Sequence, residues 1–229
     1  MISDGVNSIV FSSLKSNTDH FTVNSLTRIE GFIEGDNAKI NWDIEVEENA
    51  KLDIILFDLF EGAREVEINV SAKGKTDVKV YVASLADNMN KHFNIKVYNN
   101  FGYAKSLVKM YGLNKGSAKF LFDGTTSVKK GAKKCDVRQD GRIINFSSKS
   151  RSTVSPKLLV GENDVKASHG AVVGFIDSKT LFYLMSRGLS TEQALSLYAK
   201  GSFMTFVDIL SDEGIKCKVE EALGVLKWM

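Results

Sequence analysis

The sequence predicts a mainly β protein, a parallel β-helix followed by a C-terminal helical domain. Two observations favour this fold: short segments of alternating apolar residues recur along most of the chain, and the apolar period becomes helical after residue 176. The 229 residues are 43% hydrophobic, enough to bury one main domain with an appendage. We expect a lead-in over residues 1–24, the β-helix core over 25–175 and the helical domain over 176–229.

The strand segments alternate between apolar and polar residues, which is typical of half-buried strands. In "AKINWDIEV" every second residue from Ala38 to Val46 is apolar, and "AKLDIILF", "VEINV", "DVKVYV", "FNIKVY" and "AKFLFDG" repeat this period. The residues expected to point inward are Ile40, Trp42, Ile44, Leu52, Ile54, Val78, Val80 and Phe120.

Small residues punctuate these strands at spacings of about 12 to 14 residues, as a stacked solenoid requires. The series is Ala38, Ala50, Ala63, Thr76, Ala104, Ala118 and Ala132, in which the step of 28 residues from Thr76 to Ala104 equals two steps of 14. An antiparallel sandwich or cupin-like barrel is the alternative, because its strands also recur between regular turns. Hairpin loops of the "DG" type are scarce, which favours the solenoid.

Capping residues mark the helices of the C-terminal domain. Asp177 is placed to cap a helix that ends at Gly188, and Ser190 with Gln193 forms a capping box for a second helix. A third helix is expected over residues 212–226. We expect the apolar stripes of these helices to make core contacts rather than a docking surface.

Charge and motifs argue against several function classes. The net charge is +2, so no strong field draws nucleic acid or an anionic membrane. The sequence shows neither a signal peptide nor a membrane-spanning apolar run, and we expect a cytoplasmic protein. No phosphate loop, HExxH motif or GxSxG elbow occurs, and the two cysteines lack metal-ligand spacing, so we do not expect an enzyme.

Two basic runs, "KKGAKKCDVRQ" and "SSKSRSTVSPK", have two interpretations. They could bind an anion, or they could be solvated turns of the solenoid, which is the more common meaning of such a pattern.

One longer segment is specific. From Gly124 to Phe203 the chain contains, in fixed order, "KGAKK" with a following Asp and Gln, a Pro-Lys-Leu step into "NDVKASHGAVVG", then "LFYLMSRG" and "GSF". This arrangement resembles the SufB/SufD family of iron-sulfur cluster assembly proteins, and the upstream strands look like the family's β-helix coils. The resemblance is to a SufD-like member in a compact form, because the sequence starts close to the predicted solenoid.

The resemblance implies a right-handed parallel β-helix and a role as an assembly scaffold. It implies a SufC-like ABC ATPase bound by the C-terminal helices, and a SufB-like subunit or a second copy bound through the β-helix. A transient iron-sulfur cluster would be assembled in that complex, and the chain alone would hold none stably.

The resemblance also implies site residues. His169 in "SHGA" matches an interface histidine of SufD-like chains, and a neutral imidazole is a suitable iron ligand. Cys135 is a weaker candidate ligand: flanking lysines would lower its pKa if the thiol were exposed, and a buried or idle thiol is the other interpretation. We expect Phe182, Tyr183 and Arg187 to contact the ATPase, because interfaces favour arginine and aromatic anchors.

Three departures from the family pattern bear on the cluster. Ala167 stands where many SufD-like chains have a cysteine, while Ser150 and Gly170 lie near the positions of a SufB-like cysteine and glutamate. Thiolates are the usual iron-sulfur ligands, so a cysteine-bearing partner is implied.

A second function class stays open: a β-helix interaction or carbohydrate-binding protein in which His169 only satisfies a turn. Carbohydrate enzymes need paired carboxylates. The strand period instead places Asp43, Glu45 and Glu47 along one solvent face.

Overall fold

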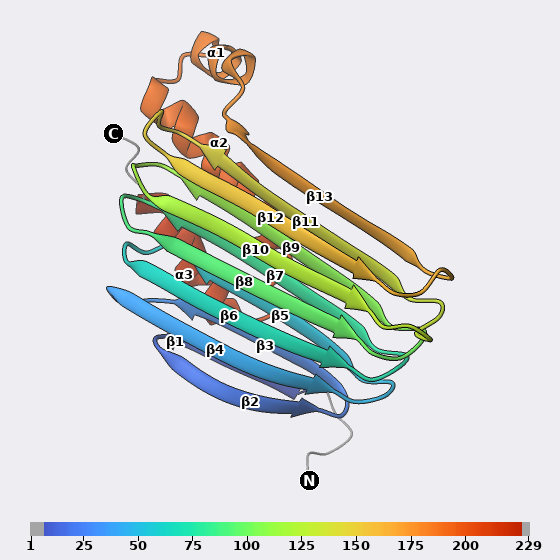
Figure 1. Cartoon of the computed structure of the whole chain (residues 1–229). Helices are drawn as coiled ribbons and strands as arrows, with labels where there is room; N and C mark the ends of the chain where they lie inside the picture. Colours follow the sequence, from blue (N-terminus) through green and yellow to red (C-terminus); the bar gives the residue numbers. More distant parts are fainter. Residues whose placement is uncertain (1–6, 226–229) are drawn as a thin grey trace.

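The computed structural model describes residues 7–225 and contains two parallel β-sheets and three helices (Figure 1). The strands are β1 (Asn7–Leu14), β2 (Asn17–Val23), β3 (Leu26–Ile33), β4 (Asn37–Val46), β5 (Lys51–Asp58), β6 (Ala63–Ala72), β7 (Asp77–Ala86), β8 (Lys91–Asn99), β9 (Lys105–Asn114), β10 (Lys119–Val128), β11 (Asp136–Asn145), β12 (Arg151–Val160) and β13 (Lys166–Phe175). The helices are α1 (Ser178–Ser186), α2 (Thr191–Val207) and α3 (Glu213–Val225).

Consecutive strands alternate between the two sheets, so each pair of strands forms one coil of a solenoid. The seven-stranded sheet has the order β1-β3-β5-β7-β9-β11-β13, and the six-stranded sheet has the order β12-β10-β8-β6-β4-β2. Neighbouring strands are parallel and in register, so that Lys51 lies beside Asp77 and Asp77 beside Lys105. The parallel pairing confirms the predicted solenoid and contradicts the antiparallel alternative.

The main core lies between the two sheets. All eight residues predicted to point inward are buried there, and Trp42 fills the first coils, where its ring packs against those of Phe11 and Phe21 with centroids 5.6 Å away. Small residues such as Ala50, Ala104 and Ala118 are buried next to the turns, where the chain is too crowded for a larger side chain. The spacing of about 13 residues therefore corresponds to one strand and one corner, half a coil.

Residues 7–23, within the segment expected as a lead-in, form β1 and β2. These strands pair in parallel with β3 and β4 respectively.

One corner of the solenoid buries charge. Asp58 at the end of β5 accepts hydrogen bonds from Arg64 Nε at 2.8 Å, Ser84 Oγ at 2.7 Å and Lys91 Nζ at 2.7 Å. The three charged side chains are fully buried. Burial lowers the pKa of Lys91 by more than the neighbouring Asp58 carboxylate raises it. The cluster holds together the loop between β5 and β6, since Lys91 also donates to the carbonyl of Phe60.

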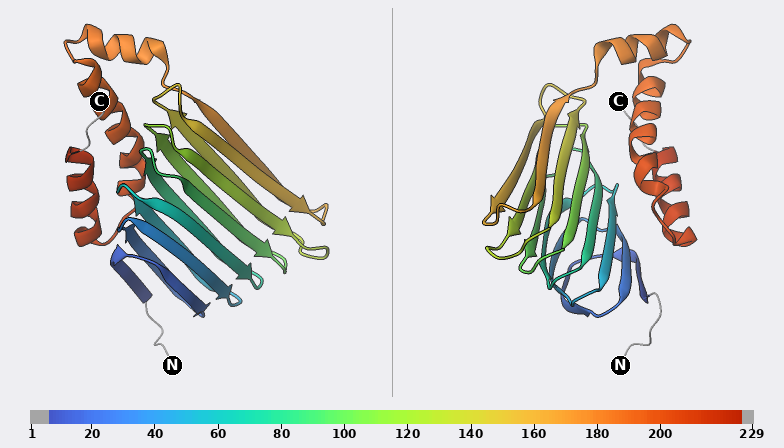
Figure 2. Two further views of the ribbon diagram at one scale, coloured as in Figure 1. Left: turned by 60° about the vertical axis from the view of Figure 1, so that its left-hand side comes forward. Right: turned by 90° about the vertical axis from the view of Figure 1, so that its right-hand side faces the viewer.

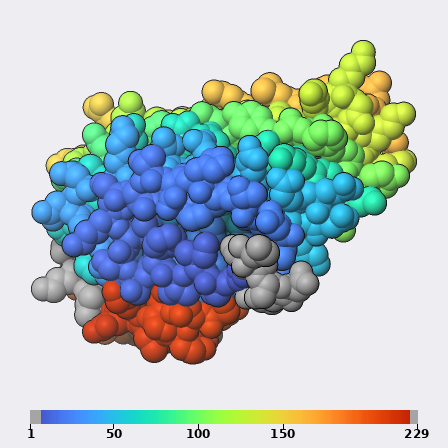
Figure 3. All heavy atoms as spheres, turned by 90° about the horizontal axis from the view of Figure 1, so that it is seen from below, coloured from blue at the N-terminus to red at the C-terminus, as the bar shows by residue number. Residues whose placement is uncertain are grey.

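Two of the helices, α2 and α3, cover part of the outer face of the seven-stranded sheet (Figure 2). On β5 and β7 the outward side chains are charged in the first half of the strand and apolar in the second half, and the helices cover the apolar half. On α2, Phe203 packs edge-on against Tyr111, and Phe206 packs against Tyr81 with centroids 6.0 Å apart. The tail runs back along the sheet, so that α3 lies against the N-terminal strands (Figure 3).

The predicted caps are present. The Asp177 side chain accepts the backbone N–H of Thr180, and Ser190 and Gln193 form the capping box at the start of α2. Gly188, just after α1, has a φ of +90°, as expected of a left-handed stop. Among the described residues, no helix has the length and apolar character needed to cross a membrane.

Candidate functional site

The last coil of the solenoid, β12 with β13, is uncovered. Each strand lies at the edge of its sheet, and no described strand follows β13. The coil exposes large apolar side chains at its surface: Leu159, Val160, Val172, Val173 and Phe175. Exposed strand edges and contiguous apolar side chains mark surfaces that pair with another chain.

His169 lies in the middle of β13, in this uncovered coil. It is exposed, and it aligns with Gln139 of β11 on the neighbouring coil. Residues in register on parallel strands point to the same side of a sheet, and Gln139 is buried in the solenoid interior. His169 therefore lies on the inward side of β13, and it is exposed because no described strand covers this end of the core.

Gln139, the glutamine of the family pattern, was not predicted as a site residue. Its side chain is fully buried, yet neither amide atom has a hydrogen-bond partner in the structure, and the same holds for the hydroxyl of Thr126. A Cβ on Gly124 would collide with the Gln139 amide, so only glycine leaves room for it. An unpartnered buried amide is rare in folded proteins. The one available signal was a polar residue at an inward position of "VRQDG".

Cys135 lies beneath the last coil, in a cluster against which Leu158 of β12 packs. Its thiol is buried in a small apolar cluster with Ala104 and Val137, and it donates a hydrogen bond to the carbonyl of Phe101 at 3.4 Å. Burial raises the pKa of Cys135, so the lowering expected for an exposed thiol does not occur. Lys134 points into solvent and pairs with Asp164 at 2.9 Å. A low-pKa thiolate is thus absent at this position, and the ligand role for Cys135 stays a prediction that burial disfavours.

The first helix, α1, protrudes from the solenoid (Figure 1). None of its residues is fully buried, although Leu181 and Leu184 are half-buried, and Phe182 and Tyr183 are 74% and 54% exposed. The Arg187 guanidinium lies 5.1 Å from the centre of the Tyr183 ring. The expectation that the apolar stripes make core contacts is confirmed for α2 and α3, whose stripes face the sheet, and is wrong for α1.

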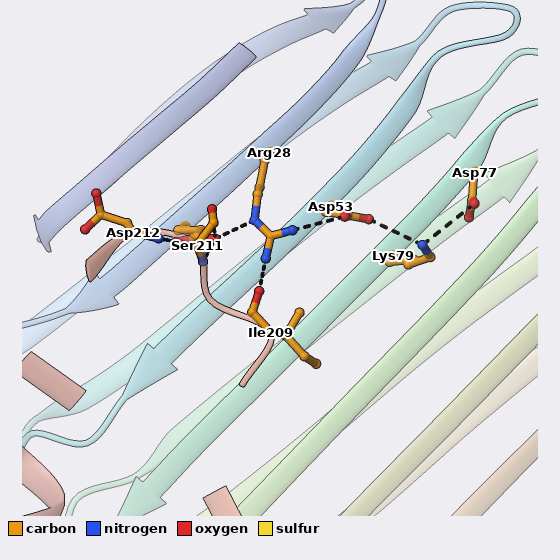
Figure 4. A network of polar contacts seen from close by, with 8 residues as sticks. Arg28, Asp53, Asp77, Lys79, Ile209, Ser211 and Asp212 are labelled. Atoms are coloured by element: carbon orange, nitrogen blue, oxygen red, sulfur yellow. Dashed lines mark hydrogen bonds and ion pairs between the residues drawn. The ribbon is translucent and has the colours of Figure 1, made fainter. Parts of the chain in front are cut away.

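A network of polar contacts, here called the polar lock, attaches the connection between α2 and α3 to the sheet (Figure 4). It consists of Arg28 and Glu30 on β3 with the backbone of Ile209, Ser211 and Asp212. Glu30 of β3 is fully buried and accepts the backbone N–H groups of Ser211 and Asp212, each at 2.8 Å. Arg28 donates to Glu30 at 2.5 Å and to the carbonyl of Ile209. Burial raises the pKa of Glu30, but the hydrogen bonds from Arg28, Ser211 and Asp212 outweigh it and leave the pKa below its usual value.

The acidic face considered for carbohydrate chemistry is engaged in pairs. Glu47 contacts Lys73 at 2.7 Å, and Asp43 accepts a hydrogen bond from Asn69 at 2.9 Å. Among residues 7–225, no three His, Cys, Asp or Glu side chains are close enough together to hold a metal ion.

The fold and these surfaces define a class of protein: a parallel β-solenoid with a helical tail, whose uncovered end and protruding helix are available for contact with other chains. Residues 24–202 match the family model described as "SUF system FeS cluster assembly, SufBD core domain". The chain belongs to this family and is SufD-like within it.

Curated relatives agree with this assignment. The chain is 38% identical over 118 residues to the iron-sulfur cluster assembly protein SufD of Bacillus subtilis, covering 51% of this chain and 27% of the relative. It is 32% identical over 124 residues to SufD of Escherichia coli, covering 54% and 29%. A SufBD family protein of Pyrococcus horikoshii is 36% identical over 115 residues, covering 48% and 25%. The matches thus span less than a third of each relative.

Proposed function

We propose that this chain is a SufD-like subunit of an iron-sulfur cluster assembly scaffold. It joins a second β-solenoid chain through the uncovered coil, β12 with β13, and an ABC-type ATPase through α1. The observation that carries the proposal is the exposure of His169 at the open end of the core, among apolar side chains that lack a covering coil.

The second chain covers the last coil. The outer edge of β13 offers unpaired backbone groups, and an added strand would satisfy them while burying Val173 and Phe175. The partner is a SufB-like subunit or a second copy of this chain. A cysteine-bearing partner fits best, because Cys135 is buried and Cys217 lies on α3, far along the chain from β13.

His169 contributes one ligand to a transient cluster at that interface. A neutral imidazole binds iron, and Cys thiolates supply most ligands of such clusters. The cluster is the cargo of the complex, and this chain performs no catalytic step on it. Such a scaffold works in the cytoplasm, where both cysteines stay reduced.

The ATPase binds α1. Phe182 and Tyr183 provide exposed aromatic surface, and Arg187 is held over the Tyr183 ring. Aromatic residues and arginine are the usual anchors of protein interfaces. Because α1 continues directly from β13, movement of the helix by the ATPase would reach the strand that carries His169.

The test is His169→Ala in a complex reconstituted anaerobically with a cysteine-bearing SufB-like chain and the ATPase. We expect the complex to assemble as before, as judged by size-exclusion chromatography, while the visible absorbance of the formed cluster falls sharply. His92→Ala is the matched control, since His92 lies on the outer face of β8 and pairs with Asp123. Unchanged cluster yield in an intact His169→Ala complex would contradict the ligand role.

A further inference from the structure

Four turns of successive coils stack along one side of the solenoid and line an open hollow of about 620 Å³. They follow β4, β6, β8 and β10, at the arrowheads of these strands in Figure 1. Backbone hydrogen bonds join them into a ladder: Lys75 N donates to Gly102 O at 3.1 Å, and Tyr103 N donates to Lys133 O at 2.8 Å. The volume lies within the range of small-molecule sites, about 300–1,000 Å³. The walls are therefore held rigidly by main-chain contacts.

Two aromatic rings line this hollow. Phe101 is 59% exposed and Tyr103 is 61% exposed, although both belong to one turn of a well-packed solenoid. Tyr103 also has a φ of +63°, a conformation that bulky residues rarely adopt. The stacked turns share this conformation, since Asn49, Lys75 and Lys134 also have positive φ, and Tyr103 is the aromatic residue among them.

The hollow is lined by charges of both signs, with lysines in excess: Glu47, Glu48, Lys73, Lys75 and Lys133. Lys73 is held by Glu47 at 2.7 Å, whereas Lys75 and Lys133 are exposed and form no ion pair within residues 7–225. Lys133 belongs to the run "KKGAKKCDVRQ", for which anion binding and a solvated turn were the two interpretations. The structure places this run beside the two rings. Charge and stacking surfaces are thus combined in one place.

We propose that this hollow binds a planar ring that carries a phosphate group, a ligand of mononucleotide size. The ring stacks on Phe101 and Tyr103, and the phosphate contacts Lys75 and Lys133. Base–aromatic stacking tolerates many ring types, and a lysine pair offers point charges to a phosphate. An acidic peptide would satisfy the lysines but would leave the ring faces without a flat partner.

The proposal does not depend on His169 or α1, which lie elsewhere on the chain. The probe is AMP, titrated against the full chain by calorimetry at low salt, with adenosine and inorganic phosphate titrated separately. We expect AMP to bind at least about tenfold more tightly than adenosine or inorganic phosphate, because only AMP contacts both the aromatic rings and the lysines. No saturable AMP binding at millimolar concentration would overturn the proposal, and so would binding of a single-stranded oligonucleotide without binding of AMP.

Four variants separate a site from general surface binding. Tyr103→Asn removes the ring while keeping a residue that tolerates positive φ, so the fold should be at least as stable. Tyr103→Asn and Phe101→Ala should each weaken the binding of AMP by about fivefold or more. Controls are Lys130→Gln and Tyr98→Ala, an exposed lysine and a partly exposed tyrosine outside the hollow. Equal weakening by the controls would overturn the proposal.

Discussion

The carboxylate of Glu30, on β3, accepts the backbone N–H of Asp212 at 2.8 Å across a separation of 182 residues. The same carboxylate accepts the N–H and hydroxyl of Ser211. Donors at the start of a helix lack partners within the helix, and a negative charge is favourable there. One buried side chain of the first coils thereby fixes where α3 begins and how the helical tail lies on the sheet.

We predict that Glu30→Gln loosens the tail. Hydrogen bonds to a charged group contribute about 1.5–3 kcal/mol, and the amide cannot accept all of these donors at its nitrogen. The loss should appear as a lower free energy of unfolding in urea and as faster hydrogen exchange in α3. Glu65→Gln is the control, because Glu65 pairs with Lys39 at the surface with both side chains more than 60% exposed. Equal effects of the two substitutions would contradict a specific lock.

Acid should release the tail for the same reason. The folded-state pKa of Glu30 is lowered, so its stabilisation is fully present above the unfolded pKa, near 4.5, and is lost as the pH falls through the folded value. Near-ultraviolet circular dichroism should report the loss, because Tyr81 and Tyr111 contact the aromatic residues of α2. Glu30→Gln should flatten this acid transition. A transition of unchanged midpoint and amplitude in Glu30→Gln would exclude Glu30 as its origin.

The sequence pattern predicted the solenoid because the pattern reflects local requirements of each strand and corner. Inward residues such as Trp42 must alternate with outward ones, and small residues such as Ala104 must recur at corners. The sequence also indicated that another element covers the outer face of the sheet. In "AKLDIILFD" the alternation of apolar and polar residues breaks at Ile55, where both faces of the strand become buried. The sequence could not predict which element covers the outer face of these strands. The cover depends on contacts between distant parts of the chain, such as the one between Glu30 and Asp212.

The candidate site was predictable only in part. His169 and the α1 aromatic residues were found through the family resemblance, and the structure shows them exposed. The unpartnered burial of Gln139 was not predicted, because an inward glutamine looks the same in sequence whether it has a partner or not. The burial of Cys135 was equally hidden, since a cysteine beside lysines can face either solvent or core.

We predict that the two cysteines differ strongly in reactivity. Cys217 is exposed, while Cys135 is buried with a raised pKa, so at pH 7–8 iodoacetamide should modify Cys217 first. Mass spectrometry of a time course should show Cys135 protected until denaturant is added. Comparable rates in the native chain would mean that the Cys135 turn opens readily, and would return Cys135 to the set of candidate cluster ligands.

The buried charge cluster should be intolerant of single substitutions. Lys91→Met leaves Asp58 with one cationic partner in the core, and breaking a buried pair costs about 3–5 kcal/mol. Thermal and urea unfolding should both shift, whereas Lys39→Met at the surface should change little. Asp58→Asn should cost more than Lys91→Met, because it leaves two buried cations, Arg64 and Lys91, without a carboxylate. A larger loss in Lys91→Met than in Asp58→Asn would show that the loop between β5 and β6 needs the lysine itself.

The last prediction concerns α1. Because its aromatic side chains are exposed, a substitution there can change the affinity for a partner without changing the stability of the fold. Phe182 is 74% exposed and no residue of α1 is fully buried, so Phe182→Ser should change the free energy of unfolding by less than about 0.5 kcal/mol. If α1 contacts the ATPase, the same substitution should weaken that complex by about tenfold or more, as truncation of an aromatic anchor does. Binding is measured by surface plasmon resonance with the ATPase immobilised, and Tyr98→Ser on the outer face of β8 is the control. A Phe182→Ser chain that folds normally and binds the ATPase with unchanged affinity would move the contact to α2 or α3.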